Sequence, residues 1–79
     1  MSDTAGTSGR DWLAAFAAEL GSTGPTDAQI DTLLELAGVA AHDSERIAAP
    51  IACWLIGRDG IEPGEALERA KAFVAARSA

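Results

Sequence analysis

The chain has 79 residues, with 12 acidic and 6 basic side chains, a net charge of -6, one cysteine and one histidine. A chain of this length forms one domain with a small core, and one cysteine with one histidine supplies neither an internal disulfide nor a four-ligand zinc site. The acidic balance and the scattered Lys and Arg side chains argue against binding to nucleic acid or to an anionic membrane.

Residues 1–9 are mostly small and polar, and we expect them to form a disordered tail before a single folded domain at residues 10–79. This N-terminus lacks the basic segment and apolar core of a secretory signal. The most apolar run, residues 47–57, is interrupted by Pro50 and is too short to span a bilayer. We therefore expect a cytoplasmic protein that does not enter a membrane.

The first predicted helix covers about residues 10–20. Its apolar side chains fall on one helical stripe: Trp12, Leu13, Phe16, Ala17 and Leu20. Ser8 or Asp11 can cap its N-terminus, and Gly21 suits the left-handed position that ends many helices.

Thr26 opens the second predicted helix, which runs to about His42. Thr26 and Gln29 have the spacing of a capping box, in which each side chain bonds the backbone N–H of the other residue. The apolar stripe of this helix comprises Ile30, Leu33, Leu34, Ala37 and Ala41. Gly38 lies inside the helix, either because another backbone approaches closely or without any structural reason.

Two prolines set the starts of the remaining helices. Proline is well tolerated at the first position of a helix and poorly tolerated further in. We therefore predict a third helix from Pro50 to about Arg58, with Gly60 ending it, and a fourth helix from Pro63. The apolar stripe of the fourth helix comprises Ala66, Leu67, Ala70, Phe73 and Val74.

No segment alternates polar and apolar residues as a strand does. The sequence thus predicts an all-α fold, a small four-helix bundle with an up-and-down course and short connections. The large side chains expected in its core are Trp12, Phe16, Leu33, Leu34, Trp54, Leu55 and Phe73.

The third predicted helix is apolar on every side, because Cys53 and Ile56 lie off the face that Ile51, Trp54 and Leu55 share. Either this helix lies deeper in the fold than the others, or its outer face contacts another chain. Exposed apolar patches usually mark interaction sites, and tryptophan is a common anchor there. We expect a protein partner or a second copy at a surface comprising His42, Arg46, Pro50, Cys53, Trp54 and Ile56.

Other uses of the polar segment before this helix stay open. His42 and Arg46 could bind an anion such as phosphate, which would make the protein a small-molecule binder or a minor enzyme subunit. Asp43 and Ser44 are similar to the modified site of acyl carrier proteins, although Glu45 follows where carriers have leucine. The adjacent residues His42, Asp43 and Ser44 are unsuited to a catalytic triad, because neighbouring side chains of a helix point in different directions.

Cys53 lies among apolar residues, and no base is placed beside it by the sequence, so we interpret it as a core residue and not as a nucleophile. We predict no catalytic residue, no cofactor and no metal ligand, and hence no enzyme.

Three segments together resemble a family of short proteins of unknown function from high-GC bacteria. They are "DWLAAFAAELG", "LLELAGVAAH" and "RIAAPIACWLIG", within Asp11–Gly57. The residues that carry the resemblance are Trp12, Leu13, Leu34, Ala37, Val39, Ala40 or Ala41, His42, Arg46, Ala48, Ala49 and Pro50. Members occur alone, joined to molybdenum cofactor guanylyltransferases, or encoded near formate dehydrogenase accessory proteins. The resemblance implies an accessory role in molybdenum cofactor or molybdoenzyme maturation, with no catalytic residue.

Overall fold

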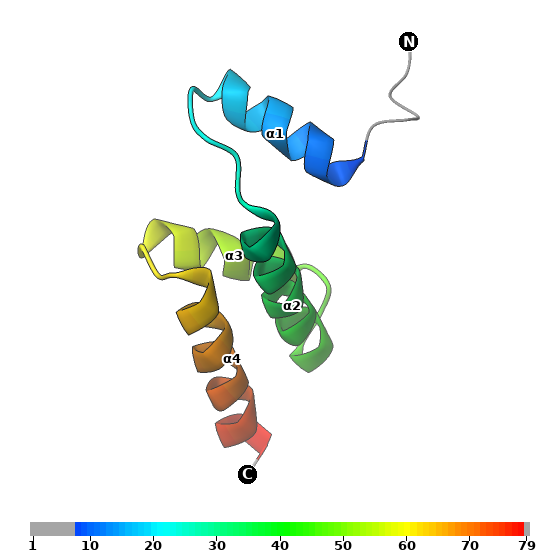
Figure 1. The fold of residues 1–79 in the computed structure, drawn as a ribbon. Coiled ribbons are helices and arrows are strands. Elements are labelled where there is room, and N and C mark those ends of the chain that lie inside the picture. Colours follow the sequence, from blue (N-terminus) through cyan, green and yellow to red (C-terminus); the bar gives the residue numbers. More distant parts are fainter. Residues whose placement is uncertain (1–7, 79) are drawn as a thin grey trace.

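The computed structural model describes residues 8–78, which form four α-helices and, within that range, no strand (Figure 1). The helices are α1 (Gly9–Glu19), α2 (Asp27–Asp43), α3 (Ala48–Arg58) and α4 (Pro63–Ser78). The predicted all-α class with four helices is confirmed. Of the tail predicted at residues 1–9, residues 1–7 lie outside the described residues, whereas Ser8 and Gly9 belong to the start of α1.

Local hydrogen bonds at the helix ends explain most of these boundaries. The Ser8 hydroxyl accepts a bond from the Asp11 N–H at 3.0 Å, which caps α1. Thr26 and Gln29 form the predicted capping box, with reciprocal bonds of 2.8 and 3.1 Å. Gly21 and Gly60 end α1 and α3 with φ values of +73° and +69°, the left-handed conformation that favours glycine.

The prediction that α3 begins at Pro50 is wrong by two residues, because the helix begins at Ala48. The first four N–H groups of a helix have no acceptor within it, so a proline in the third position loses no hydrogen bond. The N–H groups of Ala48 and Ala49 donate to the carbonyls of Glu45 and Arg46 at 2.9 and 3.2 Å. This tight turn supplies the start of α3, where no side chain caps the helix.

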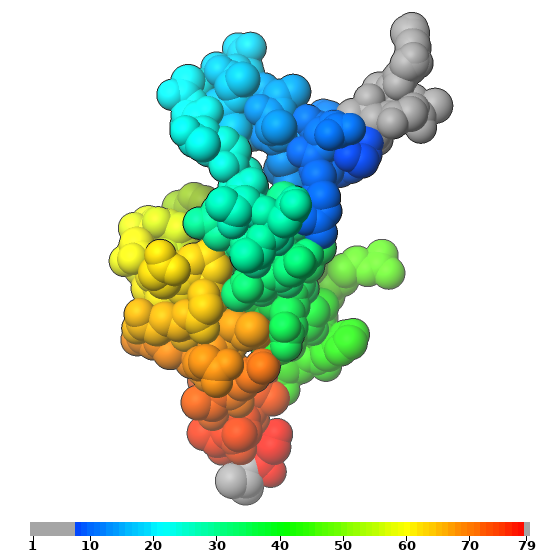
Figure 2. Space-filling view, viewed as in Figure 1, coloured from blue at the N-terminus to red at the C-terminus, as the bar shows by residue number. Residues whose placement is uncertain are grey.

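α2 is the central helix of the fold. α3 and α4 both pack extensively against α2, whereas α1 makes few contacts with any other helix. α4 lies along α2 and α3 crosses behind α2, with α1 at the N-terminal end of α2 (Figures 1 and 2). The radius of gyration is 14.4 Å, compared with about 11 Å for a compact domain of this size. The arrangement is therefore more open than a closed up-and-down bundle.

The core is small and differs from the one expected. Leu36, Ala66 and Leu67 form the buried cluster, surrounded by half-buried apolar residues that include Leu33, Cys53 and Ile56. Of the large side chains expected in the core, only Leu33 packs against this cluster. The other six are 40–63% exposed: Trp12, Phe16, Leu34, Trp54, Leu55 and Phe73. Periodicity identified apolar faces correctly, but several of these faces have no helix packed on them.

Candidate interaction surface

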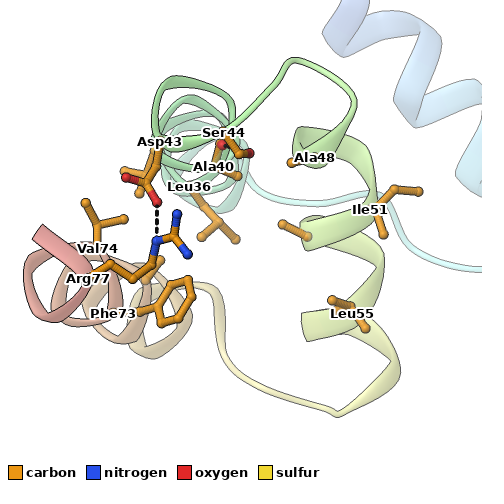
Figure 3. Close-up of a pocket in the computed structure, with 13 residues that line it drawn as sticks. Leu36, Ala40, Asp43, Ser44, Ala48, Ile51, Leu55, Phe73, Val74 and Arg77 are labelled. Carbon is orange, nitrogen blue, oxygen red and sulfur yellow. Dashed lines mark hydrogen bonds and ion pairs between the residues drawn. The ribbon is translucent and has the colours of Figure 1, made fainter.

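An apolar groove lies where α3 and α4 separate over the C-terminal half of α2 (Figure 3). It has a volume of about 350 Å³. Leu36 and Phe73 point into it from α2 and α4 (Figure 3). Its apolar lining comprises Leu36, Val39 and Ala40 of α2, Ala48, Ile51, Ala52 and Leu55 of α3, and Ala70, Phe73 and Val74 of α4.

Three polar residues, Asp43, Ser44 and Arg77, border this groove, and each is already bonded within the chain. Arg77 Nε donates to Asp43 Oδ2 at 3.0 Å, and its guanidinium lies 5.4 Å from the centre of the Phe73 ring. The Ser44 hydroxyl donates to the Ala40 carbonyl at 2.7 Å. Each of these three polar residues makes a bond within the chain and the rest of the lining is apolar, so the groove is suited to an apolar ligand surface more than to a charged one.

The outer face of α3 continues the apolar surface beyond the groove. No residue of this helix is fully buried, and Ile47, Ile51 and Trp54 are 73%, 57% and 59% exposed. The Arg58 guanidinium lies 4.9 Å from the centre of the Trp54 ring. We call Ile47, Ile51, Trp54 and Leu55 the α3 face. The helix therefore does not lie deeper in the fold than the others, and contact of its outer face with another chain stays a prediction.

The residues predicted for the interaction surface do not all lie on the α3 face. Trp54 points outward and Pro50 is exposed in the first turn, but Cys53 and Ile56 are half-buried against the core. His42 and Arg46 are exposed, and neither lines the groove. Sequence reasoning missed Phe73 and Arg77, because it considered one helix at a time and these residues come from α4. Their only signal was the position of Phe73 on the apolar stripe of its own helix.

The bonds around Asp43 and Ser44 differ from those expected of a catalytic triad or of the modified serine of an acyl carrier protein. The Asp43 carboxylate is paired with Arg77, and the Ser44 hydroxyl is bonded to the last turn of α2. Within residues 8–78, no hydrogen bond joins His42, Asp43 and Ser44 as a relay, and no group of three or more His, Cys, Asp or Glu residues is placed to hold a metal. Burial raises the pKa of the Cys53 thiol above its ordinary value, which disfavours the reactive thiolate.

Comparison with known proteins identifies the family. None of the described helices has the length and apolar character needed to cross a membrane. No curated protein and no solved structure matches the chain. A family described as a domain of unknown function, DUF6457, matches residues 4–79. Because this match covers nearly the whole sequence, the chain belongs to the DUF6457 family.

Proposed function

We propose that this domain is a non-catalytic interaction module, which binds a protein partner through the α3 face and the adjoining groove. The observation that carries the proposal is that α3, the most apolar of the helices, has no fully buried residue. Exposed apolar surface of this kind is costly in water and marks interaction sites on small proteins. Trp54 is the natural anchor, because a large exposed ring loses the most contact with water when a partner covers it.

The resemblance described above further suggests the setting in which the module acts. It supports an accessory role in molybdenum cofactor synthesis or molybdoenzyme maturation in the cytoplasm, with a guanylyltransferase or a formate dehydrogenase accessory protein as the first partners to test. This part of the proposal depends on the resemblance alone, because the α3 face has no feature that selects a molybdenum protein.

A binding experiment with Trp54→Asp tests the proposal. The tagged full-length chain is used to capture partners from its native host, and candidate partners identified by mass spectrometry are purified and titrated. We expect Trp54→Asp to weaken binding by about tenfold or more, as for a central anchor. Ala75→Asp is the matched control, because it places a carboxylate at an exposed position of α4 outside the groove. Equal binding by wild type and Trp54→Asp, with both chains equally helical, would contradict the proposal.

One observation favours a second candidate function, anion binding. Among the Lys and Arg residues of the described chain, Arg46 is the one that makes no ion pair, and it lies four residues after the exposed His42. A small anion could therefore be held in the turn between α2 and α3. Thermal shift with inorganic phosphate, nucleotides and pterin phosphates tests this: stabilisation that His42→Ala abolishes supports it, and no stabilisation by any of them counts against it.

A further inference from the structure

α1 carries an apolar ridge that no other helix covers. Trp12, Phe16 and Leu20 are 55%, 45% and 64% exposed, and they lie at every fourth residue along one side of the helix. The Trp12 and Phe16 rings stack on each other, with their centres 5.0 Å apart. With Leu13 beside them, these side chains form the α1 ridge. A ridge with this spacing is how amphipathic helices occupy apolar grooves in other chains.

In the observed fold, the α1 ridge does not contact the groove of the same chain. Arg10 bonds Asp27 and Asp31 at 3.0 and 2.7 Å, which holds α1 at the N-terminal end of α2. The Ser22 N–H and hydroxyl both donate to the Ala17 carbonyl, which orders the first residues of the loop after α1. The groove begins at Leu36, about 14 Å further along α2 from Asp27 at 1.5 Å per residue. These contacts must break before α1 can occupy its own groove.

The dimensions of the ridge and the groove match. The α1 ridge extends from Trp12 to Leu20, about 12 Å along the helix, and the part of α2 in the groove, from Leu36 to Ser44, has the same length of about 12 Å. The exposed side chains of the α1 ridge offer roughly 400 Å² of surface, and the atoms that line the groove offer less. If two copies use both surfaces, about 1,000 Å² is buried in total, which is near the lower limit for a specific interface.

We infer that two copies of this chain associate by reciprocal docking, in which the α1 ridge of each copy occupies the groove of the other. This inference rests on the proposed function, since it names a second copy as a partner of the groove beside α3. Both surfaces are then covered in one two-fold symmetric contact, and neither remains open to form chains of copies. The contact also adds to a buried cluster that contains only Leu36, Ala66 and Leu67.

The test uses one charge substitution on each surface of the full-length chain. Phe16→Glu disrupts the α1 ridge, and Phe73→Glu disrupts the groove. Ala15→Glu and Ala72→Glu are the matched controls, because each lies on the same helix at an exposed position outside these surfaces. By size-exclusion chromatography with light scattering, we expect wild type and both controls to be dimers. Each Phe variant should raise the dissociation constant about tenfold or more.

Mixing the two Phe variants tests the reciprocal arrangement itself. Phe16→Glu retains an intact groove and Phe73→Glu retains an intact α1 ridge, so a mixed pair has one native contact of the two. We expect the mixture to form a heterodimer that neither variant forms alone. Two copies that pair ridge to ridge, or groove to groove, cannot be rescued by mixing, and absence of rescue would overturn the inference.

A second measurement covers the case in which a variant loses its fold. In Trp54→Phe, Trp12 is the only tryptophan, and its fluorescence should shift to shorter wavelength as the protein concentration rises and the α1 ridge is covered. A wild-type chain that is monomeric at every concentration, with an unchanged Trp12 spectrum, would overturn the inference. The proposed function would still stand if a different protein bound in a Trp54-dependent manner. Conversely, the chain could form dimers by reciprocal docking while no other protein binds it. That result would support the inference and would contradict the proposal that a different protein is the partner.

Discussion

Cys53 is a residue whose chemistry is changed by its position in the fold. It lies on the side of α3 that packs against the core, between Ala52 and the exposed Trp54. Burial disfavours the charged thiolate and raises the thiol pKa. We therefore predict that alkylation of Cys53 by iodoacetamide is slower in the native chain than in the denatured chain, with its rate rising at a higher pH. Mass spectrometry over a pH series measures this, and identical profiles for both states would contradict it.

The same shift in pKa has a consequence for stability, with a defined sign. Because the folded chain holds the thiol neutral, the stability linked to Cys53 is fully present below the pKa of the unfolded thiol and is lost as the pH rises from that pKa through the higher pKa of the folded thiol. Cys53→Ala removes the titrating group and is the control, so its free energy of unfolding should fall less at alkaline pH than that of wild type.

At the scale of the helices, the sequence predicted what depends on local backbone chemistry. The Thr26–Gln29 box, the Ser8 cap and the glycines at 21 and 60 each act within a few residues, so the helices they bound were found. Which faces are covered depends on how helices far apart in the sequence pack. That is why Trp54 was expected in the core and is exposed, and why Phe73 was missed as part of the groove. The interaction role of these residues stays a prediction.

Gly38 allows a prediction about α2 as an element. The close approach of another backbone, one of the two explanations for Gly38, is not seen in the described chain, because a Cβ added at this position has no neighbour within 4 Å. Alanine has a helix propensity better than that of glycine by about 1 kcal/mol, so Gly38→Ala should stabilise the chain by roughly that amount. Gly21→Ala is the contrasting variant, because φ of +73° strains alanine there and should destabilise the end of α1.

Chemical denaturation followed by circular dichroism measures both glycine substitutions. A destabilising effect of Gly38→Ala would contradict the observed open space, and would indicate that another backbone approaches α2 there. Repeating the measurement at several protein concentrations shows whether that backbone belongs to the same chain or to a second copy, since a contact between copies makes the effect depend on concentration.

The described part of the molecule combines an extended shape with exposed large apolar side chains on each of its four helices. Its extents are 50 × 25 × 18 Å, and the ion pairs that join α1 to α2 are those of Arg10, which are exposed and therefore contribute little to stability. A chain of this kind gains stability when the α1 ridge and the groove are covered. Reciprocal docking therefore predicts a midpoint of unfolding that rises with protein concentration.

Salt dependence follows from the charge of the whole molecule. Each copy has a net charge of -6, so two copies repel each other, while the α1 ridge and the lining of the groove are mainly apolar. Salt screens the repulsion, since the Debye length falls from about 30 Å at 0.01 M to about 8 Å at 0.15 M ionic strength, but it does not weaken apolar contact. We therefore predict that the dimer dissociation constant decreases as sodium chloride is raised over this range, measured by analytical ultracentrifugation. If it increased instead, ion pairs between the copies would have to hold the dimer, and the contact of the α1 ridge with the groove could not be its main source of affinity.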